Sequence, residues 1–200
     1  MSGTTELMHR SLSVVALTVV LMAPEQAMSA DNCTLSELLA LRAAIQEDSA
    51  AFTQERRIHY VRNPLLSSGY LRFVAPDHLE MIVSNPEAET FIYDDGMLSF
   101  NKPGDEHTEQ VSVDSSLLLS AMFSGLIGTL SGNEDELKRV FFVKFEAGGC
   151  NWRMSLIPKS KRVLEKVLEI ELRGTEQQID EMEIRQANGD RSLLRITEQQ

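Results

Sequence analysis

Apolar and polar residues alternate along much of the chain, and this pattern predicts a protein built mainly from β-strands. A clear example is the segment 67–81, in which two short runs are separated by Pro76. Successive side chains of a strand point to opposite faces, so each run has two sides. One side carries Leu71, Phe73, Leu79 and Met81. The other carries Arg72 and Glu80 and can meet water. The apolar side therefore buries either the protein's own core or something that the protein carries.

The same pattern extends over both halves of the chain and predicts ten strands in total. The first five are expected at 49–61, 70–74, 78–84, 91–93 and 97–100. The second five are expected at 140–145, 151–157, 167–173, 179–186 and 192–197. Asp95-Gly96 and Asn188-Gly189 are typical of tight turns between paired strands. Asn63-Pro64 and the segment 67–69 predict the loop that precedes the second strand.

A helix is predicted near residue 35. Thr34 and Glu37 have the spacing of a capping box, in which each residue satisfies a backbone N–H at the start of a helix. Leu38, Leu41 and Ile45 follow at helical spacing. We expect these three side chains to form the buried face of the helix.

The middle of the chain has a different pattern, and the segment 114–132 is apolar almost all round. It predicts a helix with Asp114 as its N-cap, too short to span a bilayer, which needs about 20 residues. A second, short helix is expected at 133–139, with acidic residues first and basic residues last, as the helix dipole favours. The order of helix, five strands, helices and five strands, with hairpin connections, predicts an α+β fold with an antiparallel sheet.

The N-terminal segment 1–30 has the layout of a secretory signal peptide, with the apolar run 12–23 followed by small residues. We expect cleavage after Ser29 or Ala30, which leaves one domain, residues 31–200, in the periplasm. The alternative is an uncleaved membrane anchor, for which the apolar run is short.

The chain has a net charge of −11 at pH 7. A strongly acidic protein is a poor partner for the phosphates of nucleic acid and for an anionic membrane surface. The charge favours either simple solubility or the steering of a partner.

The sequence contains two cysteines, Cys33 and Cys150. An even number of cysteines in an exported protein predicts a disulfide, and two free thiols are the alternative. The residues just before Cys33 do not fit a lipid-attachment motif, so we expect no lipid there.

The sequence shows no pattern that is typical of catalysis. His59, His78 and His107 have no metal-binding spacing. There is no nucleophilic serine motif and no glycine-rich phosphate loop. We therefore expect no catalytic residue, no metal and no cofactor, and a protein that is not an enzyme.

Three loose motifs occur in a fixed order along the chain. The first comprises Phe52 and Gln54, then Gly69, Leu71 and Phe73, then Pro76 and Leu79. The second is the hairpin ETFIYDDGMLSF around Asp95-Gly96, and the third comprises Trp152, Leu156 and Pro158. In this order they resemble the LolA family, the periplasmic carriers of outer-membrane lipoproteins.

The resemblance implies an unclosed antiparallel half-barrel with a helical lid over an apolar cavity for acyl chains. It also implies an inner-membrane donor complex and an outer-membrane acceptor as partners. The best-known carriers have an arginine just before the proline, where this chain has Ala75, and an aromatic residue where it has Leu79. The latch of the lid and the ligand are therefore expected to differ, and some divergent relatives serve the export of glycolipids or lipid-linked pigments.

These observations predict a carrier that shields the acyl chains of lipoproteins, or of a related lipid, between the two membranes. The side chains expected to line its cavity are Leu71, Phe73, Leu79, Met81, Val83, Phe91, Phe100, Leu118, Met122, Trp152 and Met154. Two alternatives stay open. The apolar face is an ordinary core, or the protein is an envelope sensor of lipid state that binds a partner on the same scaffold.

Overall fold

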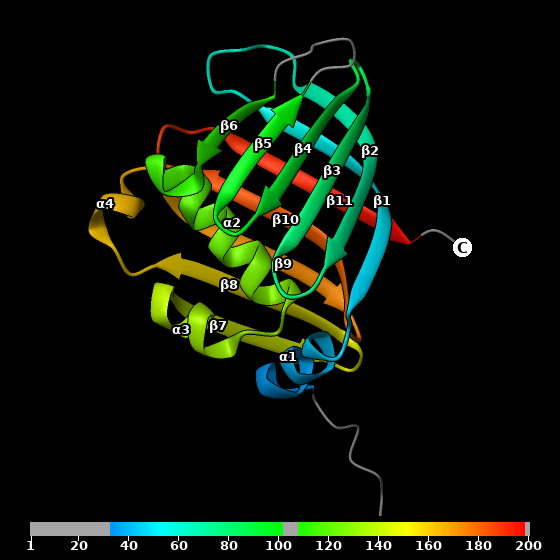
Figure 1. Ribbon diagram of the computed structural model, residues 1–200. Coiled ribbons are helices and arrows are strands. Elements are labelled where there is room, and N and C mark those ends of the chain that lie inside the picture. Colours follow the sequence, from blue (N-terminus) through cyan, green and yellow to red (C-terminus); the bar gives the residue numbers. More distant parts are fainter. Residues whose placement is uncertain (1–32, 102–107, 199–200) are drawn as a thin grey trace, which may run out of the picture.

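A computed structural model describes residues 33–101 and 108–198 (Figure 1). Its eleven strands form one sheet in the order β6-β5-β4-β3-β2-β1-β11-β10-β9-β8-β7. The first six are β1 (Glu47–Arg57), β2 (Leu65–Val74), β3 (His78–Asn85), β4 (Glu89–Asp94), β5 (Met97–Asn101) and β6 (Glu109–Ser112). The others are β7 (Phe141–Gly148), β8 (Asn151–Pro158), β9 (Val167–Thr175), β10 (Gln178–Gln186) and β11 (Arg191–Glu198).

The helices of the described residues precede the sheet, connect its two halves and interrupt its second half. They are α1 (Leu35–Ala43), a 3-10 turn η1 (Val113–Ser115), α2 (Leu117–Leu130), α3 (Glu134–Val140) and α4 (Lys161–Leu164). None of them is long and apolar enough to cross a membrane.

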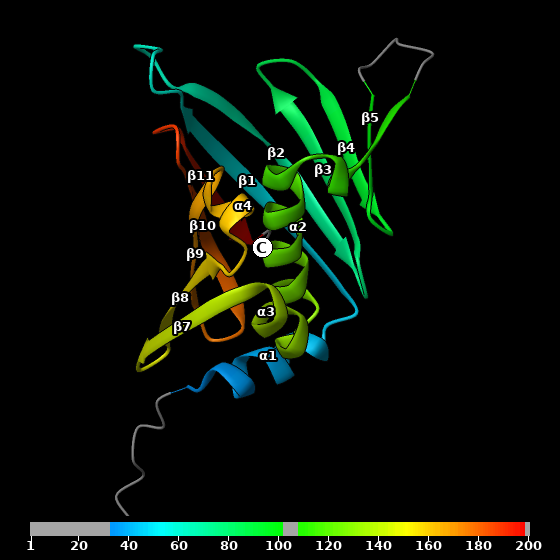
Figure 2. The same cartoon turned by 90° about the vertical axis from the view of Figure 1, so that its left-hand side faces the viewer.

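The sheet is strongly bent, and α2 lies between its two halves (Figure 2). Every strand pairing is antiparallel, and β6 and β7 are the two ends of the strand order. Because these two edges are not joined within the described residues, the sheet remains unclosed and α2 occupies its concave side. The predicted fold class, an α+β antiparallel half-barrel covered by helices, is confirmed.

The inner face of the sheet is apolar because strand register aligns apolar residues in rows. One row crosses the first half and contains Ala50, Leu71, Met81, Phe91 and Phe100. Another crosses the second half and contains Leu194, Met182, Leu172, Met154 and Phe145. The predicted two-sidedness of the segment 67–81 is also confirmed, because Phe73 lies opposite Leu79 and Arg72 lies opposite Glu80.

Local signals predicted several element boundaries correctly. Thr34 and Glu37 form the capping box of α1. Asp95 and Gly96 both have positive φ, at 44° and 75°, in the turn between β4 and β5. The short helix α3 has Asn133 as its N-cap, and its acidic and basic residues are distributed as predicted.

Two boundary predictions were wrong. Ser116 rather than Asp114 is the N-cap of α2, because Val113 is hydrogen-bonded to Gly96 and the chain forms η1 first. The segment 67–69 lies within β2 rather than in a loop. At Gly69 the strands approach so closely that an added Cβ would lie 1.9 Å from the carbonyl oxygen of Ile82.

Two elements were missed and one face was misassigned. The strand β6 and the helix α4 are only four residues each and have no clear periodicity. In α1 the buried residues are Leu38, Leu39 and Arg42, while Leu41 is 52% exposed. The predicted signal peptide, residues 1–30, lies outside the described residues.

Candidate functional site

A small cavity lies on the concave side of the sheet, where α1, the C-terminal end of α2 and the central strands meet. It encloses about 50 Å³. Its walls are mostly apolar and comprise Arg42, Asp48, Ser49, Ala50, Leu71, Phe73, Leu79, Leu126, Leu130, Ile179 and Ile196. The lining side chains thus come from both halves of the sheet and from the helix between them.

Three of the eleven residues predicted from the sequence line this cavity: Leu71, Phe73 and Leu79. Another six are distributed over the rest of the inner face and over α2: Met81, Val83, Phe91, Phe100, Leu118 and Met122. All of these except Phe100 belong to the apolar core or pack against it, and the Phe100 ring lies 6.3 Å from that of Phe91.

The remaining two predicted residues, Trp152 and Met154, lie in the closed core of the second half of the sheet. The Trp152 Nε1–H donates to the backbone carbonyl of Glu176 at 2.8 Å. Met154 is fully buried. Neither side chain lines the cavity.

The helix α2 packs on the inner face through aromatic and small residues. The Phe123 ring stacks on that of Tyr93 with 4.5 Å between the ring centroids, and burial raises the pKa of the Tyr93 hydroxyl. Gly125 admits the side chains of Leu156 and Ile170, each 3.2 Å from where a Cβ would lie. Five apolar residues of this helix stay only half-buried: Leu117, Leu118, Leu119, Met122 and Ile127.

Arg42 is the one cationic residue of the cavity wall, and its side chain is only 2% exposed. Its Nη1 donates to Asp48 Oδ2 at 3.0 Å and to the backbone carbonyl of Gln177 at 3.3 Å. Its Nε and Nη2 are buried and have no hydrogen-bond partner. A buried donor without a partner costs about 1–3 kcal/mol. Sequence reasoning missed this residue, although Arg42 lies one helical turn after the buried Leu38.

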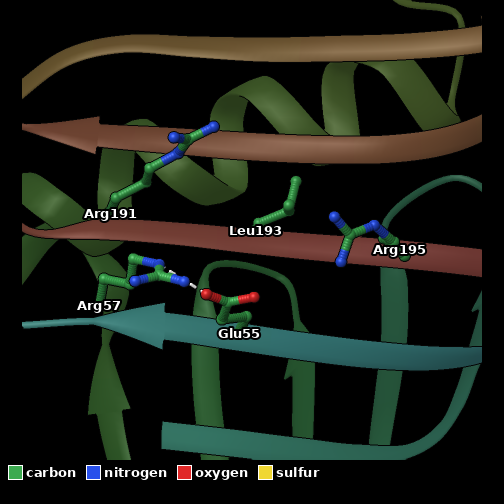
Figure 3. Close-up of a pocket in the computed structure, with 5 residues that line it drawn as sticks. All are labelled: Glu55, Arg57, Arg191, Leu193 and Arg195. Carbon is green, nitrogen blue, oxygen red and sulfur yellow. Dashed lines mark ion pairs between the residues drawn. The ribbon is translucent and has the colours of Figure 1, made fainter. Parts of the chain in front are cut away.

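A second hollow, of about 210 Å³, lies across β1 and β11 on the outer face (Figure 3). It is lined by Glu55, Arg57, Arg191, Leu193 and Arg195. Arg57 pairs with Glu55 at 2.6 Å, and Arg191 pairs with Glu183 at 2.6 Å. Four of the five lining side chains are charged, so this hollow does not suit an acyl chain.

Cys33 and Cys150 are both free thiols in the structure, and the disulfide between them stays a prediction. Cys33 packs against the core, whereas Cys150 is exposed to solvent, so the two thiols face different environments. Burial raises the pKa of the Cys33 thiol, and the charges of Glu37 and Cys150 add to this effect.

Comparison with known proteins gives a family match over most of the chain. Residues 23–197 match the family described as outer membrane lipoprotein carrier protein LolA-like. A comparison with curated proteins finds no match.

Solved structures with a similar fold include three from bacteria. A LolA superfamily protein from Nitrosomonas europaea is 9% identical, with a TM-score of 0.44, and the match covers 84% of this chain and 94% of that one. A putative outer membrane lipoprotein-sorting protein domain from Vibrio parahaemolyticus is 11% identical, with a TM-score of 0.46 and coverage of 81% and 88%. The Pseudomonas aeruginosa MucA/MucB complex contains a chain that is 8% identical, with a TM-score of 0.44 and coverage of 82% and 56%.

The assignment to a family rests on the sequence match, which spans both halves of the sheet and all the helices between them. The chain belongs to the family of LolA-like outer membrane lipoprotein carrier proteins.

Proposed function

We propose that this protein is a carrier that shields the acyl chains of lipoproteins, or of a related lipid, between the inner and the outer membrane. The observation that carries the proposal is the apolar concave face of an unclosed sheet, which an almost wholly apolar helix covers. An ordinary core of this kind needs only one apolar stripe on its covering helix. Here α2 also carries Leu118, Leu119 and Met122, which pack against the core but stay only half-buried.

In the proposed carrier, α2 acts as a lid, and the small size of the cavity supports this. Pockets for small molecules enclose about 300–1,000 Å³, whereas this cavity encloses about 50 Å³. An acyl chain therefore enters when α2 moves away from the sheet and the chain takes over its contacts with Leu71, Phe73 and Leu79. Each buried methylene is worth about 0.8 kcal/mol. The contacts that the acyl chain gains therefore offset the contacts that α2 loses, and loading stays reversible.

The lid is held differently from the best-known carriers. Ala75, at the position of their arginine, packs against the core and has no polar side chain. We propose that the stack of Phe123 on Tyr93 is the main contact between the lid and the first half of the sheet. Such a carrier makes and breaks no covalent bond, so we propose no enzymatic activity.

The proposed role places the protein in the periplasm, with an inner-membrane donor complex and an outer-membrane acceptor as partners. It requires that residues 1–30 are removed as a signal peptide and that residues 31–200 form the single mature domain. The intact mass of protein recovered from the periplasm checks this, because a retained Met1 would contradict it. Mass spectrometry of lipids that co-purify would distinguish a lipoprotein from a glycolipid or a lipid-linked pigment.

The second candidate function is that of an envelope sensor that reads lipid state and binds a protein partner. One observation favours it. The loop between β1 and β2 and the start of β2 expose four apolar side chains: Tyr60, Val61, Leu65 and Leu66. Exposed apolar groups that are close together mark interaction surfaces, and a carrier also needs such a surface for its donor or acceptor.

A test of the carrier function places a charge on the concave face. Phe73 and Leu79 are 2% and 6% exposed, and an unpaired charge there is costly. Phe73→Glu and Leu79→Glu should each abolish most of the binding of a fluorescent fatty-acid methyl ester and its displacement by a diacylated peptide.

The matched control is Arg72→Ala, which changes the opposite face of the same strand and should leave binding unchanged. Far-UV circular dichroism identifies the variants that fold. If folded Phe73→Glu and Leu79→Glu proteins bind the ester as the unchanged protein does, the concave face is only a core and the sensor function is favoured.

A further inference from the structure

The cavity contains a cation with an unused hydrogen-bonding edge. Both N–H groups of Arg42 Nη1 have acceptors, in Asp48 and in the carbonyl of Gln177. The three remaining N–H groups, on Nε and Nη2, have no partner although these atoms are buried. Nε and Nη2 form one side of the planar guanidinium, and two parallel N–H groups of this kind match the two oxygens of a carboxylate or a phosphate.

We infer that this cavity binds the acidic head of an acyl amphiphile, with Arg42 as the residue that recognises the carboxylate or phosphate oxygens. The inference rests on the proposed carrier function and narrows its cargo. An anionic head on Arg42 lets the acyl chain continue along the apolar wall of Leu71, Phe73 and Leu79, beneath α2.

The surroundings of Arg42 explain why the ligand should be anionic and amphiphilic. Apart from Asp48 and Ser49, the other residues of the cavity wall are apolar, so no other residue of the wall competes for the free edge of Arg42. Asp48 binds on the Nη1 side, and its side chain is 38% exposed, so water screens its repulsion of a second anion. A neutral acyl group would fill the apolar part and leave the buried N–H groups without acceptors.

A purely structural role accounts for only part of this geometry. Nη1 alone ties α1 to β1 and to the turn between β9 and β10. A tie of this kind uses one nitrogen and does not need the Nε–Nη2 edge to be buried beside an apolar cavity without hydrogen-bond partners. The unused edge is therefore the observation that points to a ligand.

The experiment compares a fluorescent fatty acid with its methyl ester at pH 8, where the acid is ionised and the ester is not. The unchanged protein should bind the acid at least about tenfold more tightly, as charge-assisted hydrogen bonds imply. In Arg42→Gln this preference should disappear while the affinity for the ester stays within about twofold, because the apolar wall is intact.

Two further variants keep the test valid if Arg42→Gln does not fold. Arg42→Lys keeps the positive charge but loses the two parallel N–H groups of the guanidinium. The preference for the acid should therefore fall by several-fold. Asp48→Asn leaves the free edge of Arg42 in place and should retain the preference. An undiminished preference in Arg42→Lys, together with a stronger preference in Asp48→Asn, would assign the effect to the general charge of the site and overturn the inference.

The remaining outcomes separate the inference from the proposed function. Equal binding of acid and ester by the unchanged protein would overturn the role of Arg42 and leave the carrier intact. Binding of neither ligand would overturn the carrier function itself. Millimolar inorganic phosphate should not displace the acid, and efficient displacement would mean that the site takes a free anion rather than the head of a lipid.

Discussion

Trp152 packs directly against the backbone of the neighbouring strand, and this contact requires a glycine. Trp152 lies opposite Gly174 in the ladder of β8 and β9. A Cβ at Gly174 would lie 2.3 Å from Cζ2 of the indole and 1.9 Å from the carbonyl oxygen of Gln178. The ring therefore covers the position that any other side chain would need.

Gly174→Ala should lower the free energy of unfolding by about 1–3 kcal/mol, as overpacking of a core does. Urea unfolding measures the loss, and the fluorescence of Trp152, the only tryptophan, reports the displaced ring. The control is Gly148→Ala, where an added Cβ meets nothing within 4 Å and where the change should stay within about 0.5 kcal/mol. Equal stability of the two variants would contradict the close packing.

His78 gives the protein a pH-dependent contact at the edge of β3. Its Nε2 lies 3.0 Å from Glu80 Oε1 and its Nδ1 lies 3.5 Å from Asp94 Oδ2. The hydrogen bond to Glu80 is the main cause that raises the pKa of His78. Because the folded state favours the protonated imidazole, this stabilisation is fully present below the ordinary histidine pKa of about 6.5 and is lost as pH rises through the raised value.

His78→Gln should therefore remove a contribution to stability that is present at pH 5 and absent at pH 8. Urea unfolding at both values, for the unchanged protein and the variant, measures the difference. A proton NMR titration should place the pKa of His78 above 6.5. A pKa below this value would show that the two carboxylates do not stabilise the charged imidazole.

In the proposed carrier, reversible loading depends on the helix α2. Its contact with β4 is the stack of Phe123 on Tyr93, and an aromatic pair is worth about 0.5–1.5 kcal/mol beyond the area that it buries. Phe123→Leu keeps an apolar side chain but removes the stack. Release of a bound acyl ester, followed by stopped-flow fluorescence, should become several-fold faster.

The control for this prediction is Ser124→Ala, at the next residue of the same helix. Ser124 has no part in the stack of Phe123 on Tyr93, so this change should leave the release rate unchanged. If Phe123→Leu releases the ester at the unchanged rate, α2 is not the element that opens. A different path into the cavity would then be required.

The sequence predicted those elements whose signals are local. Alternation identified ten of the strands, and the capping box and the Asp95-Gly96 turn each depend on residues a few positions apart. The strand β6 was missed because its four residues are mostly exposed and pair only through the edge of β5. The buried position of Arg42 could not be predicted, because its acceptor Gln177 lies 135 residues away.

The candidate site was predicted less completely than the sheet for the same reason. Leu71, Phe73 and Leu79 share one face of a hairpin, which a single segment of sequence reveals. Their neighbours across the cavity, Ile179 and Ile196, come from the far end of the chain. Only the strand order, with β1 next to β11, brings these residues together.

At the scale of the molecule, one ladder, that of β1 with β11, joins the two halves of the sheet among the residues that the structure describes. All other neighbouring strands are consecutive in the chain, so each half consists of hairpins that form from local contacts. The connection by α2 and α3 runs across the open side and joins the halves without a backbone ladder. The half-barrel therefore depends on the pairing of its first and last strands.

If the chain is exported as proposed, this ladder also limits how early the molecule is able to fold as it emerges from a membrane translocon. Gln54 of β1 donates a hydrogen bond to Ser192 of β11, 138 residues later in the chain. Until β11 has emerged, β1 remains an open edge and the apolar concave face lacks half of its cover. Exposed edges and apolar faces of this kind promote aggregation, and contacts between distant residues slow folding. A newly exported chain should therefore need a periplasmic chaperone that covers its apolar concave face until β11 pairs with β1. The face proposed to bind acyl chains would then first be bound by that chaperone.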